Sequence, residues 1–319
     1  MNEPVLEARD LWVYYHTRRG PVKAVDHVSF TIREGETLGI VGETGCGKST
    51  LGKAILGILP PKTAVGGELR FRGEDLLAID RERFRRIRGK DLALIFQDPM
   101  TRLDPLMTIE GHFTETIRAH EDVSKKAARD RAKRTLASMG VPENRLDTYP
   151  HELSGGMRQR IMIAMALAMN PTLLVADEPT TSLDVIVEAQ VLEILADLKR
   201  AHMMSLLLIT HNLGIVAEVC DRVAVMYAGQ IVELGGVHNV FKRPIHPYTQ
   251  GLLASIIHLD SAELSSIDGL PPDLVAPPSA CRFHPRCRYA KTICETKSPE
   301  WVEYRPGHFA QCHFGTDFL

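Results

Sequence analysis

The sequence predicts an α/β fold in which a region of short strands is followed by strands that alternate with helices. Residues 1 to about 72 hold β-branched, aromatic or alternating segments separated by turn residues such as Gly35. From Leu92 onward, apolar strand candidates alternate with helical stretches, which is typical of a largely parallel sheet covered by helices. The third observation is a glycine-rich turn over residues 42–49, placed between a strand and a helix.

Each element is expected from its local pattern. Strands are predicted over residues 5–15, 28–32, 37–41, 68–71, 92–96, 172–176, 205–210 and 223–227. A helix is predicted over 48–59, and another over 185–202, where apolar residues recur with the helical period. The charged, alanine-rich stretch 109–140 predicts a helical subdomain, and the proline-rich stretch 259–280 predicts an extended linker.

Composition and charge narrow the class of protein. The chain has 319 residues, with 38 Lys and Arg against 40 Asp and Glu, so it has no overall basic field for nucleic acid. Two basic runs, 81–90 and 125–134, are interleaved with acidic residues and are interpreted as solvated faces. The longest apolar run, 161–169, is shorter than the roughly 20 residues of a membrane span, and the acidic N-terminus is unlike a signal peptide. A cytoplasmic location is therefore expected.

The glycine-rich turn matches G-x-x-x-x-G-K-[ST], the pattern of a phosphate-binding P-loop. Its residues are Gly42, Glu43, Thr44, Gly45, Cys46, Gly47, Lys48 and Ser49. Glycines let backbone N–H groups approach phosphate oxygens, Lys48 neutralises the β- and γ-phosphates, and Ser49 can bind Mg²⁺. ATP and Mg²⁺ are thus the expected ligands. Cys46 is interpreted as a tolerated small residue, with a reactive thiol as the less favoured alternative.

A second motif is an apolar strand that ends in two carboxylates, Asp177 and Glu178. After a P-loop, such a Walker B segment places Asp177 near the metal ion and Glu178 beside the γ-phosphate. The predicted chemistry is in-line attack of water on the γ-phosphorus, with Glu178 as general base or water-positioning group.

A third motif identifies a family. Its residues are Leu153, Ser154, Gly155, Gly156 and Met157. With this LSGG signature, the sequence resembles the ATP-binding subunits of ABC transporters. The resemblance implies an ABC-type nucleotide-binding domain with an antiparallel β subdomain and a helical signature subdomain. It also implies a dimer in which the signature of one subunit meets the γ-phosphate held by the P-loop of the other.

The resemblance assigns further positions. Tyr15 is similar to the residue that stacks on adenine, with Tyr14 or Trp12 as the fallback and core packing as the rival interpretation. Gln97 resembles the Q-loop glutamine, which touches Mg²⁺ or the attacking water, and His211 matches the switch histidine. Ser182 and Asp184 resemble the D-loop, and Thr50 completes the nucleotide-binding set.

Three stretches resemble the dipeptide and oligopeptide permease branch, which also includes nickel importers. They are residues 96–105, 243–250 and the cysteine-rich C-terminus. In the first stretch Arg102 stands where the branch usually has Ser, at the surface where a membrane subunit would dock.

Four of the six cysteines, Cys281, Cys287, Cys294 and Cys312, follow the spacing C-x5-C-x6-C-x17-C. Family members with this pattern hold a [4Fe–4S] cluster, and zinc sites usually contain a closer C-x2–4-C pair. The cluster is favoured, with zinc, disulfides or free thiols as alternatives. His284, His308 and His313 are alternative ligands, although solvated loop histidines are the preferred interpretation.

The resulting expectation is the ATPase subunit of an importer for dipeptides, oligopeptides or a related solute, peripheral on the cytoplasmic face of the membrane. The expected domains are 1–258 for the ATPase, with a helical subdomain at about 98–170, then the 259–280 linker and the 281–319 module. Expected partners are two transmembrane permease subunits, a second ABC ATPase (a paralogue or another copy) and, indirectly, an extracytoplasmic solute-binding protein; nucleic acid is not expected. Nickel is the alternative substrate, and a soluble ABC ATPase of translation or DNA repair is the alternative function.

Overall fold

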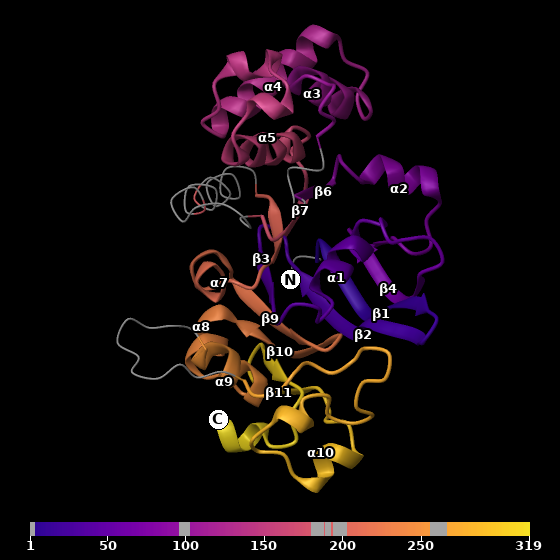
Figure 1. Cartoon of the computed structure of the whole chain (residues 1–319), viewed down its shortest axis with the longest axis vertical. Helices are drawn as coiled ribbons and strands as arrows, with labels where there is room; N and C mark the ends of the chain where they lie inside the picture. The colour runs from indigo at the N-terminus through magenta and orange to yellow at the C-terminus, as the bar shows by residue number, and fades with distance from the viewer. Residues whose placement is uncertain (1–3, 96–102, 180–187, 189–192, 194–202, 256–266) are drawn as a thin grey trace. The chain divides into compact units, whose positions relative to one another are not determined.

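The computed structural model describes residues 4–95, 103–179, 188, 193, 203–255 and 267–319 (Figure 1). They form two compact units. The P-loop unit comprises Leu6–Ile32, Glu36–Leu77 and Leu208–Leu319, and the signature unit comprises Met1–Val5, Arg33–Gly35 and Ala78–Leu207. No helix among the described residues is both long enough and apolar enough to cross a membrane.

The P-loop unit begins with an antiparallel sheet. Its strands, in the order β2-β1-β4-β5, are β2 (Gly20–Ile32), β1 (Leu6–Thr17), β4 (Ala64–Phe71) and β5 (Glu74–Asp75). β2 begins much earlier than predicted, because its first half pairs with the end of β1, with Thr17 opposite Gly20. His27 has a left-handed φ of 56° and interrupts the alternation along the strand, so the predicted strand began only at residue 28.

A second set of strands in the same unit carries the P-loop. The order β11-β12-β10-β9-β3 comprises β11 (Val302–Arg305), β12 (His308–Ala310), β10 (Gln230–Gly236), β9 (Arg222–Tyr227) and β3 (Thr37–Val41). β3 and β9 pair in parallel, as predicted for this region, whereas β10, β11 and β12, which the sequence did not predict, form antiparallel pairs. Ala228 and Gly229 have φ values of 46° and 86°, so a two-residue hairpin turn joins β9 to β10.

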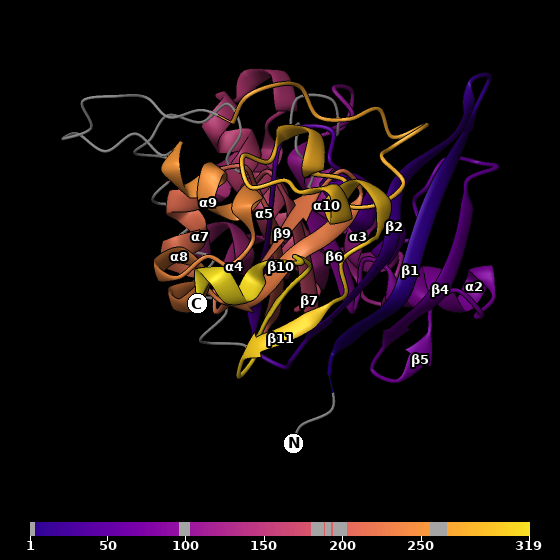
Figure 2. The same ribbon diagram turned by 90° about the horizontal axis from the view of Figure 1, so that it is seen from below.

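The C-terminal residues are built into this unit (Figure 2). β12 pairs with β10, and Phe283 packs with Tyr227 and Tyr248 in the same apolar core as β3 and β9. The helices of the unit are α1 (Lys48–Ile55), α7 (Leu213–Val219), α8 (Val237–Lys242), α9 (Pro247–Ala254) and α10 (Thr292–Thr296). Short 3-10 turns are η4 (His284–Arg286) and η5 (Gly315–Phe318).

A buried carboxylate fixes the turn before α9. Glu233, on β10, accepts hydrogen bonds from the backbone N–H groups of Ile245 and His246, both at 2.8 Å. His308 Nε2 lies 2.7 Å from Glu233 Oε1, and both side chains are fully buried. The interpretation of His308 as a solvated loop residue was therefore wrong, because this histidine lies on β12 inside the core.

The signature unit contains the strands β6 (Leu92–Ile95) and β7 (Leu173–Asp177), which pair in parallel as predicted, and the start of β8 (Ser205–Ile209). Its helices are α2 (Arg81–Ile87), α3 (Ile109–Arg118), α4 (Lys125–Ser138) and α5 (Gly155–Leu167), with the 3-10 turns η2 (Glu143–Asp147) and η3 (Pro150–Glu152). Figure 1 shows α3, α4 and α5 gathered together. Of the predicted helix 185–202, only Glu188 and Glu193 lie among the described residues.

The helices of the signature unit follow from capping and periodicity. Thr108 and Ser124 cap α3 and α4: the Thr108 side chain accepts a hydrogen bond from the backbone N–H of Gly111, and the Ser124 side chain accepts one from that of Ala127. α4 buries Ala128, Ala132 and Leu136, which lie four residues apart on one face. In the basic run on this helix, Arg129 forms ion pairs with Glu110 and Asp147.

Candidate functional site

The P-loop connects β3 to α1. Val41 and the rest of β3 are buried, and the chain turns through Gly42, which has a φ of 151°, and Gly47, which has a φ of 111°. A methyl group at Gly42 would collide with the backbone carbonyl of Met226, and one at Gly47 with that of Ala24. Glycine is required at both positions by backbone contacts as well as by φ.

The side chain of Lys48 is held inside the P-loop by hydrogen bonds to backbone carbonyl groups of the loop. The side chain is buried, and Nζ donates hydrogen bonds to the carbonyl oxygens of Gly42 at 2.7 Å and Glu43 at 3.0 Å. Gly45 has no neighbouring atom within 4 Å of an added methyl group, and Thr44 is exposed, so the crest of the loop is open. α1 begins at Lys48 without a side-chain cap, so no capping side chain covers the start of this helix, and a helix N-terminus is suited to binding an anion.

Cys46 is buried in this loop. Burial raises the pKa of the Cys46 thiol, and the positive charge of Lys48 lowers it to a smaller extent. A thiol with a raised pKa is a poor nucleophile, which favours the interpretation of Cys46 as a tolerated small residue.

The three aromatic residues on β1 that are candidates for stacking on adenine have different neighbours. The Tyr15 hydroxyl donates a hydrogen bond to Thr50 Oγ1 at 3.1 Å, next to the start of α1. Tyr14 instead donates to Asp26, and Trp12 packs against Tyr14 with their ring centres 4.8 Å apart. Tyr15 is therefore in contact with the P-loop helix.

His211 lies just after the end of β8, and the residue before it contacts the strand that carries the P-loop. The Thr210 backbone N–H donates to the Ile40 carbonyl at 3.2 Å, and the P-loop begins two residues after Ile40. His211 is exposed and immediately precedes Asn212, which caps α7.

In the signature unit, every residue of β7 is buried, and Asp177 and Glu178 stand at its end. Glu178 has a φ of 48°, an uncommon left-handed conformation for a residue other than glycine. Strained backbone of this kind is concentrated at functional sites, where surrounding structure holds it. The carboxylate of Glu178 thus extends from a turn with a left-handed backbone.

The signature motif begins α5. Ser154 Oγ accepts a hydrogen bond from the backbone N–H of Met157 at 3.3 Å, Leu153 is buried, and Gly155 faces open space. Gln159, on the next turn, donates from Nε2 to the carbonyl of Pro179, directly after Glu178. Gln159 was not predicted from the sequence; its side chain links the signature helix to the carboxylate turn.

The comparisons with known proteins agree with these motifs. Residues 25–181 match the family model of the ABC transporter, and residues 232–294 match the oligopeptide/dipeptide transporter C-terminal region. The dipeptide transport ATP-binding protein DppD of Bacillus subtilis is 47% identical over 97% of this chain and 94% of its own length. The oligopeptide transport ATP-binding protein OppD of Salmonella typhimurium is 45% identical over 97% and 93%. The chain belongs to the ABC transporter ATP-binding proteins.

Solved structures of this family share the fold. The bacterial ABC transporter cassette MJ0796, whose structure is dimeric, matches with a TM-score of 0.66 and 26% identity over 73% of this chain and 98% of that one. The cassette cbiO1 of Clostridium perfringens matches with a TM-score of 0.64 and 27% identity over 76% and 92%. The nucleotide-binding fold predicted from the motifs is confirmed.

Three predicted positions of this ABC subunit, Gln97, Ser182 and Asp184, lie outside the described residues, as does Arg102. The remaining motif residues fall into two groups. The P-loop unit holds the P-loop, Tyr15, Thr50 and His211, and the signature unit holds the signature, Asp177 and Glu178.

All four C-terminal cysteines of the ABC subunit line one cavity. Its other walls are mainly aromatic and include Phe283, Phe314, Phe318 and Tyr289. Burial raises the pKa of Cys281 to about 11 and that of Cys312 to about 12. Thiolates in this apolar cavity would therefore need the charge of a cation.

The described side chains of the cavity are not arranged as a metal site. Among the described residues, no group of three or more His, Cys, Asp or Glu side chains is arranged to hold a metal ion. A single zinc ion would need its sulfur ligands at about 2.3 Å from one centre. Two candidate histidines line the cavity but have backbone partners: His284 Nδ1 lies 2.8 Å from the Cys281 carbonyl, and His313 Nε2 lies 2.8 Å from the Lys297 carbonyl.

Proposed function

We propose that this chain is the ATP-hydrolysing subunit of an importer of dipeptides or oligopeptides. The observation that carries the proposal is the P-loop, in which Lys48 is buried below an open crest, in a chain similar to peptide transport ATP-binding proteins over nearly its whole length. These relatives act in transport, which favours an importer over a soluble ATPase of translation or DNA repair. The chain works at the membrane with two permease subunits, a second ABC ATPase and a solute-binding protein.

We propose that each motif residue has one role in hydrolysis. Lys48 and the P-loop N–H groups bind the β- and γ-phosphates, Tyr15 stacks on adenine, and Ser49, Asp177 and Gln97 hold Mg²⁺, which offsets the charge of the phosphates. Glu178 accepts a proton from the attacking water, and His211 contacts the γ-phosphate. The buried strand β7 and the left-handed turn at Glu178 support a fixed position for this base.

We propose that the signature acts in trans. Ser154, Gly155 and Gly156 lie at the start of α5, where Gly155 faces open space, and they are flanked by the buried Leu153 and by Met157, whose backbone N–H donates to Ser154. This open helix start would complete the γ-phosphate site of a second ATPase chain, with Ser182 and Asp184 of the D-loop at the same interface. The dimeric structure of the similar cassette MJ0796 supports the proposal.

The substrate class is tested by uptake in cells that lack this chain. We expect loss of labelled dipeptide and oligopeptide uptake with nickel uptake unchanged, and restoration by the wild-type chain. The opposite pattern, with loss of nickel uptake alone, would replace peptides by nickel as the substrate.

We further propose that the cysteine-lined cavity holds a [4Fe–4S] cluster on Cys281, Cys287, Cys294 and Cys312. Four cysteines are the usual ligand set of such a cluster, and a cluster is larger than a single ion, so its ligands stand further apart. The convergence of all four thiols on one aromatic cavity supports a site with four thiolate ligands. A bound cluster would cross-link the C-terminal residues.

Replacement of Cys287 by serine is expected to remove most of the iron. The anaerobically purified wild-type chain should contain about four irons per chain and be brown. Iron and acid-labile sulfide are measured by elemental and colorimetric analysis, with Cys220→Ser, outside the cavity, as the matched control. Colourless wild-type protein with one zinc per chain would overturn the proposal.

A further inference from the structure

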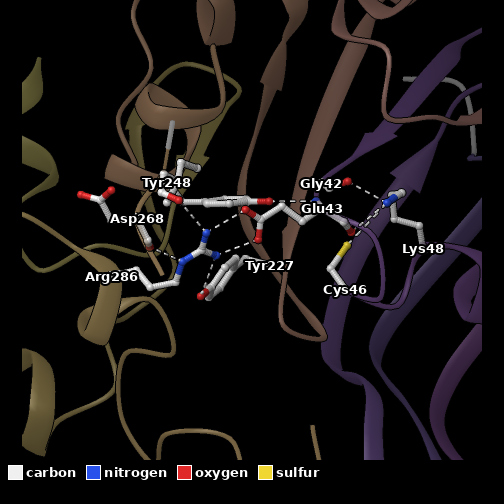
Figure 3. Close-up of polar contacts among 9 residues, drawn as sticks. Gly42, Glu43, Cys46, Lys48, Tyr227, Tyr248, Asp268 and Arg286 are labelled. Atoms are coloured by element: carbon white, nitrogen blue, oxygen red, sulfur yellow. Dashed lines mark hydrogen bonds and ion pairs between the residues drawn. The ribbon is translucent and has the colours of Figure 1, made fainter. Parts of the chain in front are cut away.

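Glu43 is bound through all three of its polar groups (Figure 3). Its backbone N–H donates to the Tyr248 hydroxyl oxygen at 2.9 Å, and its carbonyl accepts from Lys48 Nζ at 3.0 Å. Its carboxylate accepts two hydrogen bonds from Arg286, one from Nη1 at 2.7 Å and one from Nη2 at 2.9 Å. This P-loop residue therefore connects the phosphate-binding lysine to α9 and to the C-terminal residues.

Arg286 is held rigidly where it meets Glu43. Its side chain is 5% exposed, and Nε donates to the Asp268 carbonyl at 2.9 Å. The guanidinium lies 5.8 Å from the ring centre of Tyr227, and Nη1 reaches the Tyr227 hydroxyl at 3.4 Å. A two-point arginine–carboxylate pair fixes direction as well as distance, so the position of Arg286 determines that of the Glu43 side chain.

The residues that hold Glu43 also belong to the surroundings of the cysteine cavity. Arg286 is the last residue of the 3-10 turn η4 and directly precedes Cys287. Phe283 directly precedes the same turn η4 and lines the cavity. The ring of Phe283 lies 5.4 Å from that of Tyr248 and 5.2 Å from that of Tyr227, measured between centres. A series of contacts therefore connects Phe283, in the cavity wall, through Tyr248 to Glu43 of the P-loop.

We propose that Arg286 is a positioning residue through which the C-terminal cysteine segment holds the P-loop ready for nucleotide, so that nucleotide affinity depends on this segment. The proposal rests on nucleotide binding by the P-loop and goes beyond it. Lys48 is anchored to the two carbonyls that Glu43 and Gly42 present, and the Glu43 contacts keep that backbone in place before nucleotide arrives. A loop that is ordered in advance binds more tightly, because ordering costs nothing at the binding step.

The test measures MgADP binding by calorimetry, which needs no hydrolysis. Arg286→Gln removes the charge and the two-point contact and is expected to weaken MgADP binding about tenfold, the size of a lost charge-assisted hydrogen bond. Arg288→Gln is the matched control in the same segment, since Arg288 is exposed and contacts the ring of Tyr289. It is expected to bind MgADP like the wild type.

A double-mutant comparison separates positioning from general destabilisation. Glu43→Gln leaves the sequence of the C-terminal segment unchanged and is expected to weaken MgADP binding to the same degree as Arg286→Gln. The double variant, with Arg286→Gln and Glu43→Gln combined, should bind MgADP no more weakly than either single variant. Iron content is measured for each variant. If Arg286→Gln loses iron, its weaker binding could come from that loss, and Glu43→Gln then decides the test. Wild-type affinity in Glu43→Gln, or effects that simply multiply in the double variant, would overturn the proposal. Failure of the wild-type chain itself to bind MgADP would instead overturn the proposed function.

Discussion

Replacement of Lys48 by methionine is expected to reduce ATP hydrolysis to background and to weaken MgATP binding about hundredfold. Methionine keeps most of the length of the side chain but removes the ammonium group, which we assign to the β- and γ-phosphates. Loss of two charge-assisted hydrogen bonds in a buried site accounts for an effect of this size. Binding is measured with a fluorescent nucleotide, and hydrolysis by phosphate release.

The matched control for this variant lies one turn later on the same helix. Lys53 is exposed on α1, and Lys53→Met should bind and hydrolyse ATP like the wild type. Wild-type MgATP affinity in Lys48→Met would contradict the assignment of Lys48 to the phosphates.

Glu178→Gln is expected to lower the rate of ATP hydrolysis about 10³-fold and to leave MgATP binding intact. The amide has nearly the shape of the carboxylate but cannot accept the proton of the attacking water, and general base catalysis contributes about 10² to 10⁴ in rate. The left-handed backbone at this position is no more costly for glutamine than for glutamate, so the turn should be preserved.

Single-turnover hydrolysis and nucleotide retention are measured on the same sample of Glu178→Gln. Glu218→Gln, an exposed carboxylate on α7, serves as the control and should turn over normally. Steady hydrolysis at the wild-type rate in Glu178→Gln would refute its role as the base.

Much of the nucleotide site could be predicted because its residues are close together in sequence. The P-loop, the carboxylates after β7 and the serine that caps α5 each combine a local motif with a strand or helix boundary, and the structure has those boundaries. The extension of β2 was missed because its first half depends on pairing with β1 across a hairpin and on a bulge at His27. Local alternation does not reveal such pairing.

The contact between Arg286 and Glu43 of the P-loop could not be predicted from local sequence patterns. Arg286 and Glu43 are separated by 243 positions, and nothing in the sequence around Arg286 distinguishes it from the other basic residues near the cysteines. Glu233 and His308 are likewise brought together only by the β10–β12 pairing. In each case the partner is chosen by the tertiary fold, which is why His308 was mistaken for a loop residue.

The central claim is that ATP is enclosed between the P-loop of one ATPase chain and the signature of another in a membrane assembly. The most direct measurement is the native mass of the assembly extracted in detergent from cells that express Glu178→Gln, with MgATP present throughout. We predict two permease subunits, two ATPase chains (two copies, or this chain and a relative) and retained ATP. Recovery of the chain alone, or with only one ATPase chain in each assembly, would contradict the account.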